Sequence, residues 1–226
     1  MPNWVFNNLS IEGSAEVIEK VKAQLNKPFI TKHTGFENTV SITTYDNPVI
    51  AFWNILSPPP EKIDIYFTSA DNKADAEWNW YAWNNHNWGT KWDIGVSNDN
   101  KYPETTMSQS SETSVQYSFQ TAWSPPLPVI EALSLQYPEL EITLEYEEEQ
   151  GWGGEIFWDS TGSSIVREYD IPESHADYES RDNEDGCNCA NSEDKDDWYD
   201  DCPGKTPDVI ELFAKRDVTQ LTEKIS

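Results

Sequence analysis

Residues 114–147 read SVQYSFQTAWSPPLPVIEALSLQYPELEITLEYE, and this stretch decides the fold. Apolar and polar residues alternate over 115–120, which is the period of a half-buried strand. Apolar residues then recur at helical spacing over 125–137, with Ser124 as the predicted N-cap. Residues 141–147 return to alternation, with one apolar face and one acidic face. The stretch therefore predicts a strand, a helix and a second strand in direct succession.

The same order of elements opens the chain. Residues 4–11 alternate as a strand, and Ser14 is a good N-cap for an amphipathic helix that extends to Asn26. Two further hairpin strands are predicted at residues 155–158 and 165–169. Two strand–helix units with strands between them predict an α+β fold, specifically a ferredoxin-like split βαβ sandwich with its helices on one face of the sheet.

The predicted domain spans residues 1–172 and contains a long insertion at about 28–83. A structureless loop of that length would be unusual, so the insertion should carry one or two small helices or strands. The composition changes sharply beyond Pro172. Residues 173–205 are predicted to be a mobile acidic loop, and residues 206–226 are predicted to contain a terminal helix.

The formal net charge is -26, from 41 acidic and 15 basic residues. This balance argues against direct binding of nucleic acid through its phosphates. It suits a surface that occupies the basic, nucleic-acid-binding groove of a partner protein, although solubility or adaptation to a salty cytoplasm is the favoured explanation of the charge. The acidic residues predicted to contact such a partner are Glu141, Glu145, Glu147, Asp182, Glu184, Asp185, Glu193, Asp194, Asp196, Asp197, Asp200 and Asp201.

The compartment is predicted from two further features. The sequence shows no leading hydrophobic segment and no stretch long enough to span a bilayer. Its three cysteines, an odd number, argue against a secreted disulfide framework. We therefore expect a cytoplasmic protein that binds no membrane.

The string NWGTKWD at residues 87–93 is the most distinctive in the chain. It occurs together with MPNW at 1–4, WYAW at 80–83, TAWSPP at 121–126, Leu133-Ser134 and Tyr137-Pro138. In this order the motifs resemble the YubB-type ferredoxin-like family found on plasmids and phages, over roughly residues 1 to 170. The resemblance implies a mobile-element origin and a ferredoxin-like fold without iron and sulfur. It implies no reaction.

Charge and resemblance together give the leading functional prediction. Phages and plasmids commonly encode acidic proteins that block host nucleases or defence complexes, and by this analogy the chain would be an accessory protein. It would bind and inhibit a host nucleic-acid-binding or defence protein through an acidic surface that resembles DNA.

The alternative prediction is a pocket for a small ligand or nucleotide in the Trp-rich region 78–93. Its candidate residues are Trp83, Asn87, Trp88, Lys91, Trp92, Asp93 and Trp123. The same rings can instead form a core that joins the sheet to the insertion, and the core is the favoured interpretation. If residues 91–93 are extended, Lys91 and Asp93 lie on one side of a strand and should form a local ion pair.

Metal binding and catalysis have weaker signals. The ligand types Cys187, Cys189, Cys202 and His175 suit zinc, but their spacing matches no standard finger, and free thiols in a loop are the favoured interpretation. A calcium loop at 182–186 is a poor match, because its glycine arrives one position early. No histidine stands in a known catalytic motif. We therefore predict no enzyme and no cofactor.

Overall fold

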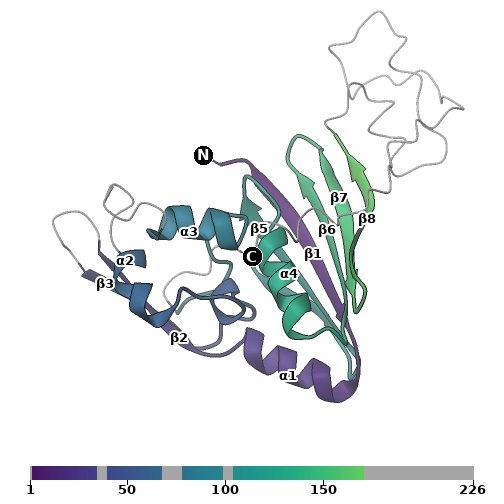
Figure 1. Cartoon of the computed structure of the whole chain (residues 1–226), viewed down its shortest axis with the longest axis horizontal. Helices are drawn as coiled ribbons and strands as arrows, with labels where there is room; N and C mark the ends of the chain where they lie inside the picture. The colour runs from purple at the N-terminus through teal and green to yellow at the C-terminus, as the bar shows by residue number, and fades with distance from the viewer. Residues whose placement is uncertain (1, 35–39, 68–77, 99–103, 171–226) are drawn as a thin grey trace, which may run out of the picture.

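The computed structural model describes residues 2–34, 40–67, 78–98 and 104–170 (Figure 1). The predicted acidic loop 173–205 and the predicted terminal helix within 206–226 lie outside these residues. Most of the predicted partner-binding carboxylates therefore lie outside as well, since only Glu141, Glu145 and Glu147 are among the described ones.

A six-stranded antiparallel sheet forms the centre of the fold, in the order β4-β5-β1-β6-β7-β8. Its strands are β1 (Trp4–Glu12), β4 (Thr106–Ser110), β5 (Ser114–Ala122), β6 (Glu141–Glu148), β7 (Gly153–Asp159) and β8 (Gly162–Tyr169). Strand β1 is antiparallel to both of its neighbours, β5 and β6. Strands β5 and β6 therefore run parallel to each other with β1 between them, which is the split βαβ arrangement.

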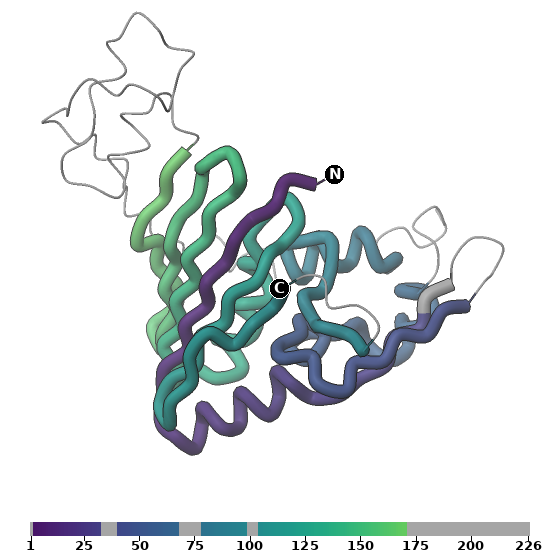
Figure 2. The backbone as a smooth tube through the Cα atoms, turned by 180° about the vertical axis from the view of Figure 1, so that it is seen from behind, coloured from purple at the N-terminus to yellow at the C-terminus, as the bar shows by residue number. Residues whose placement is uncertain are grey.

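The fold is ferredoxin-like α+β, as predicted. Helix α4 (Leu127–Gln136) connects β5 to β6, and helix α1 (Ala15–Leu25) follows β1. Both helices lie on one face of the sheet, and Figure 2 shows the strands from behind with neither helix in front of them. The hairpin β7–β8 extends the sheet beyond β6.

The core fills the space between the helices and the sheet. Because side chains alternate between the two faces of a strand, Leu9, Tyr117 and Leu144 point toward the helices. Because a helix repeats every 3.6 residues, Val21 of α1 and Leu133 of α4 point toward the sheet. All five side chains are buried. The opposite, uncovered face of the sheet packs against none of the described helices and carries the polar residues of the alternation.

Helix α4 begins later than the sequence indicated. Pro126 occupies its N-cap position, and no side chain caps the helix there. Ser124 was predicted as the N-cap, but its hydroxyl donates a hydrogen bond to the carbonyl oxygen of Gly89 instead. The prediction was wrong because a contact 35 residues away in sequence uses the side chain that local pattern assigned to the helix.

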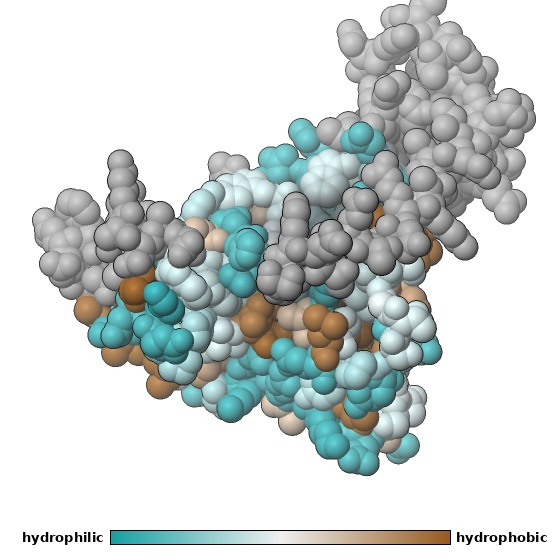
Figure 3. Space-filling view, in the orientation of Figure 1, coloured by the Kyte–Doolittle hydropathy of each residue, from teal (hydrophilic) through white to brown (hydrophobic). Residues whose placement is uncertain are grey.

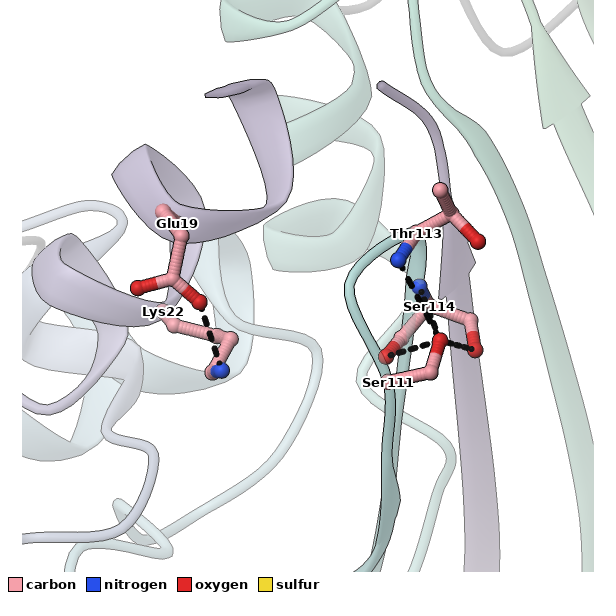
Figure 4. A network of polar contacts seen from close by, with 5 residues as sticks. All are labelled: Glu19, Lys22, Ser111, Thr113 and Ser114. Atoms are coloured by element: carbon pink, nitrogen blue, oxygen red, sulfur yellow. Dashed lines mark hydrogen bonds and ion pairs between the residues drawn. The ribbon is translucent and has the colours of Figure 1, made fainter. Parts of the chain in front are cut away.

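Short polar contacts stabilise the surface of α1 and the β4–β5 turn (Figure 4). On α1, Lys22 Nζ lies 2.8 Å from Glu19 Oε1, an exposed pair of the kind that adds a few tenths of a kcal/mol. In the turn, the Ser111 hydroxyl accepts hydrogen bonds from the backbone N–H groups of Thr113 and Ser114. These bonds satisfy backbone donors that the hairpin leaves unpaired.

The predicted insertion contains a two-stranded ribbon and several short helices. Its elements are β2 (Phe29–Thr34), β3 (Val40–Tyr45), η2 (Phe52–Asn54), η3 (Pro60–Lys62), α2 (Ile63–Tyr66) and the start of α3 (Trp80–Asn87). Asn54 joins this region to α1, since its amide donates to the carbonyl oxygens of Leu25 and Lys27 at 3.0 and 2.9 Å. These carbonyls lie at the end of α1 and lack helical partners.

The ribbon exposes apolar side chains on its outer side. Ile30, Val40 and Ile42 are all more than half exposed, and Figure 3 shows apolar surface gathered over the β2–β3 ribbon at the left of the view. Among the residues that the structure describes, no helix combines the length and the apolar character needed to cross a membrane.

Candidate functional site

A cavity of about 480 Å³ lies between the end of the main sheet, α3 and the β2–β3 ribbon. This volume falls within the range typical of ligand pockets, roughly 300 to 1,000 Å³. One wall carries Trp4, Trp80, Trp88 and Trp92, and the other carries Phe29, Tyr45, Trp53 and Tyr66. The described lining therefore combines eight aromatic residues with seven polar ones, and most of its accessible surface is apolar.

The aromatic side chains of the insertion hold one another in place. Phe29 and Tyr45, which are directly opposite in the ribbon, stack with ring centroids 4.3 Å apart. Trp53 stacks on Phe29 at 6.0 Å and contacts Tyr66 at 5.5 Å. Such pairs add stability beyond the area that they bury, so this wall is formed before any ligand arrives.

Among the described lining residues the Asp93 carboxylate is the one acidic group, and four backbone N–H groups donate to it. Oδ1 accepts from Phe52, Ile94 and Gly95 at 2.7 to 3.0 Å, and Oδ2 accepts from Trp53 at 2.9 Å. Asp93 thereby fixes η2 against the loop 88–97. Burial raises the pKa of Asp93, while the hydrogen bonds from Trp53, Phe52, Gly95 and Ile94 act in the opposite direction.

The charge of Asp93 affects the pKa of the two tyrosines that line the cavity. Burial, and after it the charge of Asp93, raises the pKa of Tyr45, and only the Thr31 hydroxyl lowers it. The same two causes raise the pKa of Tyr66, whose hydroxyl donates to Asn84 Oδ1 at 2.9 Å. Both phenols are therefore neutral near pH 7 and lie in the field of an anion.

The loop 88–97 is held at the end of the sheet by side-chain contacts. Thr90 Oγ1 donates to the carbonyl oxygen of Ala122 at 3.0 Å and accepts from its N–H at 3.1 Å. Gly89 has a φ of 79°, and a Cβ there would lie 2.5 Å from the Pro128 ring. The glycine of the NWGTKWD motif is thus required by a left-handed conformation and by close packing against the start of α4.

The predicted pocket residues divide between the cavity and its surroundings. Trp88, Trp92 and Asp93 line the cavity, whereas Trp83 is buried in the core beside it, with its ring 5.4 Å from that of Trp88. The Asn87 amide donates to the backbone carbonyl of Trp83 at 2.9 Å. Core and pocket are therefore two parts of one aromatic cluster in this region.

Lys91 and Trp123 lie outside the cavity, at its rim. Trp123 is 42% exposed, has an unusual φ of 70° and stacks on Trp92 at 6.5 Å. The Lys91 ammonium lies 4.3 Å from the centroid of the Trp92 ring and 4.9 Å from that of Trp123. The predicted ion pair between Lys91 and Asp93 does not form, because the segment is not a strand and Asp93 instead accepts from backbone N–H groups.

Sequence reasoning missed Trp4, Trp53 and the ribbon residues Phe29 and Tyr45. They come from three segments that are distant from residues 78–93, and only the folded chain brings them together. One signal was available in the sequence: Trp80, Asn84 and Trp88 recur every four residues, which places the cavity-lining side chains on one face of α3.

The uncovered face of the sheet carries the three described carboxylates of the predicted acidic surface. Register places Glu141 opposite Glu12 on β1, and Glu145 opposite Glu155 on β7. Arg167, the only basic residue between positions 104 and 170 of the sequence, lies 3.2 Å from Glu155 and 3.6 Å from Glu145. Within the described residues, no ion pair relieves the repulsion between Glu12 and Glu141.

The metal hypothesis gains no site in the described part of the chain. Cys187, Cys189, Cys202 and His175 lie outside it, and within it no three side chains of His, Cys, Asp or Glu come together as a metal centre. His86 is exposed on α3, and no hydrogen bond or ion pair joins it to Asp93 among the described residues.

Comparison with known proteins gives two similarities. Residues 97–190 match the family model for the ferredoxin-like domain in Api92-like protein. The match continues past residue 172, into the acidic segment that the resemblance to the YubB-type family did not include. The crystal structure of a protein Api92 from Yersinia pseudotuberculosis is similar at 11% identity, over 76% of this chain and 99% of that chain, with a TM-score of 0.44. No curated protein matches the chain.

Proposed function

We propose that this chain is a small-molecule-binding protein and that its binding site is the aromatic cavity. The observation that carries the proposal is the coincidence of size and chemistry. The cavity has a volume of about 480 Å³, its described lining includes eight aromatic residues and seven polar ones, and its surface is mostly apolar, as in ligand sites. The stacked rings of the insertion also supply a preformed wall, so little ordering is required on binding.

Blocking the cavity is expected to abolish binding. Thr43 lines the cavity and its neighbour Thr44 does not, since successive side chains of a strand point to opposite faces. We expect Thr43→Trp to fill the cavity, and Thr44→Trp to serve as a control with the same added volume. Isothermal titration calorimetry with benzyl alcohol, adenosine monophosphate and choline as probes should show that at least one of them binds the wild type and Thr44→Trp, and that none binds Thr43→Trp.

Two outcomes would contradict this proposal. One is the absence of binding for every probe to the wild type, and the other is equal binding to Thr43→Trp. The thermal unfolding midpoint of both variants should be measured first, because an overpacked side chain can lower stability by about 1–3 kcal/mol.

A second function is favoured by the charge on the uncovered sheet face. Here we propose a phage or plasmid accessory protein of the YubB-type family that uses Glu141 and Glu147 to bind a basic surface of a host protein. The supporting observation is the unrelieved like-charge pair of Glu12 and Glu141 in adjacent strands. A lysine or arginine from a partner would relieve that repulsion, and electrostatic attraction would make the encounter fast and sensitive to salt.

Reversing charge on this face should change stability and partner binding in opposite directions. In Glu141→Lys the new ammonium can pair with Glu12, so we expect stability to rise by a few tenths of a kcal/mol. Retention of host proteins at low salt should fall in the same variant. Glu61→Lys, in η3, makes the same charge change away from the sheet and should retain partners as the wild type does.

A further inference from the structure

We infer that the ligand of the aromatic cavity is an organic cation, of the quaternary or methylated ammonium class. The inference rests on the proposed small-molecule-binding function and specifies its substrate class. It depends on the lining as a whole: the described lining residues include eight aromatic ones and one carboxylate, and no lysine, arginine or histidine is among them.

Aromatic faces attract cations. The negative face of a tryptophan or tyrosine ring stabilises an ammonium within about 6 Å, and several rings around one space form the cage that binds quaternary ammonium groups. The chain shows the same attraction within itself, because the Lys91 ammonium lies 4.3 Å from the centroid of the Trp92 ring. Trp92 also lines the cavity.

The carboxylate of Asp93 adds a fixed negative charge behind the rings. Its four N–H donors stabilise the negative charge, so it can stay ionised without a direct contact from the ligand. A methylated ammonium has no N–H that would need such a contact. The site offers aromatic rings and a negative charge that acts at a distance. It therefore suits a methylated ammonium better than a ligand that must donate hydrogen bonds to a carboxylate.

The remaining features of the site fit the same class. The cavity has room for a trimethylammonium head with an attached group. The net charge of -26 also concentrates cations around the molecule and opposes the approach of anions such as nucleotides.

The test compares choline with 3,3-dimethylbutan-1-ol, which replaces the cationic nitrogen by carbon and keeps the shape. Titration calorimetry at 0.15 M salt is expected to show at least tenfold tighter binding of choline to the wild type and to Thr44→Trp. Neither compound should bind Thr43→Trp. Persistence of choline binding in Thr43→Trp would mean attraction to the acidic surface alone, and it would overturn the inference.

The other outcomes separate this inference from the function on which it rests. Equal or tighter binding of the neutral compound overturns cation recognition and leaves a small-molecule site. Binding of benzyl alcohol without choline does the same. Binding of adenosine monophosphate alone overturns the inference and leaves the proposed function, whereas failure of all four compounds to bind the wild type means that both are wrong.

Discussion

Asp93→Ala is expected to lower the free energy of unfolding by about 3 kcal/mol or more. The substitution leaves four backbone N–H groups without their acceptor, and each buried donor that loses its partner costs about 1–3 kcal/mol, part of which water entering the space will restore. In a protein of this size that loss corresponds to roughly 6–12 °C in the unfolding midpoint. Thermal and urea denaturation would measure it.

The matched control is Asp64→Ala, which removes the same side chain from an exposed position in α2. It should change stability by about 0.5 kcal/mol or less. Equal destabilisation by the two substitutions would show that the hydrogen bonds from backbone N–H groups to Asp93 do not determine its contribution to stability. The loss of stability in Asp93→Asn should fall between those of the two alanine variants, since the amide nitrogen cannot accept a hydrogen bond from the N–H of Trp53.

The pH dependence of Asp93 has opposite signs for stability and for ligand binding. Because burial raises its pKa in the folded state, the folded chain holds the Asp93 proton more tightly than the unfolded chain. Its contribution to stability is therefore greatest below the unfolded pKa and declines as pH rises through the raised, folded pKa. Cation binding needs the ionised form, so choline affinity should fall as pH is lowered through that folded pKa, and Asp93→Asn should remove the dependence.

The fold could be predicted from the sequence because its elements are local and regular. The alternation over 115–120 and 141–147, with helical spacing between them, is enough to specify a split βαβ unit. The start of α4 could not be predicted in the same way. Ser124 has the chemistry of an N-cap, but its partner is Gly89, and no local pattern reveals a contact between positions so far apart.

The cavity could be predicted only in part, for the same physical reason. Residues 87–93 form a distinctive string, and three of the residues singled out there, Trp88, Trp92 and Asp93, do line the cavity. The opposite wall comes from the ribbon and η2, where Phe29, Tyr45 and Trp53 look like ordinary core residues in sequence. An enclosed site depends on which distant segments meet, and this is decided by tertiary packing rather than by local pattern.

The two tryptophans of NWGTKWD should respond very differently to substitution by alanine. Trp88 is 1% exposed, contacts Phe52 and Trp83, and donates its indole N–H to the carbonyl oxygen of Leu56 at 2.8 Å. Trp88→Ala should therefore cost about 3–5 kcal/mol, the usual range for a large aromatic side chain removed from a core. Denaturant unfolding followed by far-UV circular dichroism would measure the loss.

Trp92 lines the same cavity but is 40% exposed, with Trp4 and Trp123 as its aromatic neighbours. Trp92→Ala should therefore cost only about 1 kcal/mol, since most of the transfer free energy of a side chain depends on the area that it removes from water. Choline affinity should nevertheless fall severalfold, because one face of the aromatic cage is lost. Comparable destabilisation by the two substitutions would mean that the rim is part of the core, whereas unchanged choline affinity in Trp92→Ala would mean that the ligand does not reach the rim. The expected contrast is that Trp88 mainly stabilises the fold around the cavity, whereas Trp92 mainly contacts the ligand.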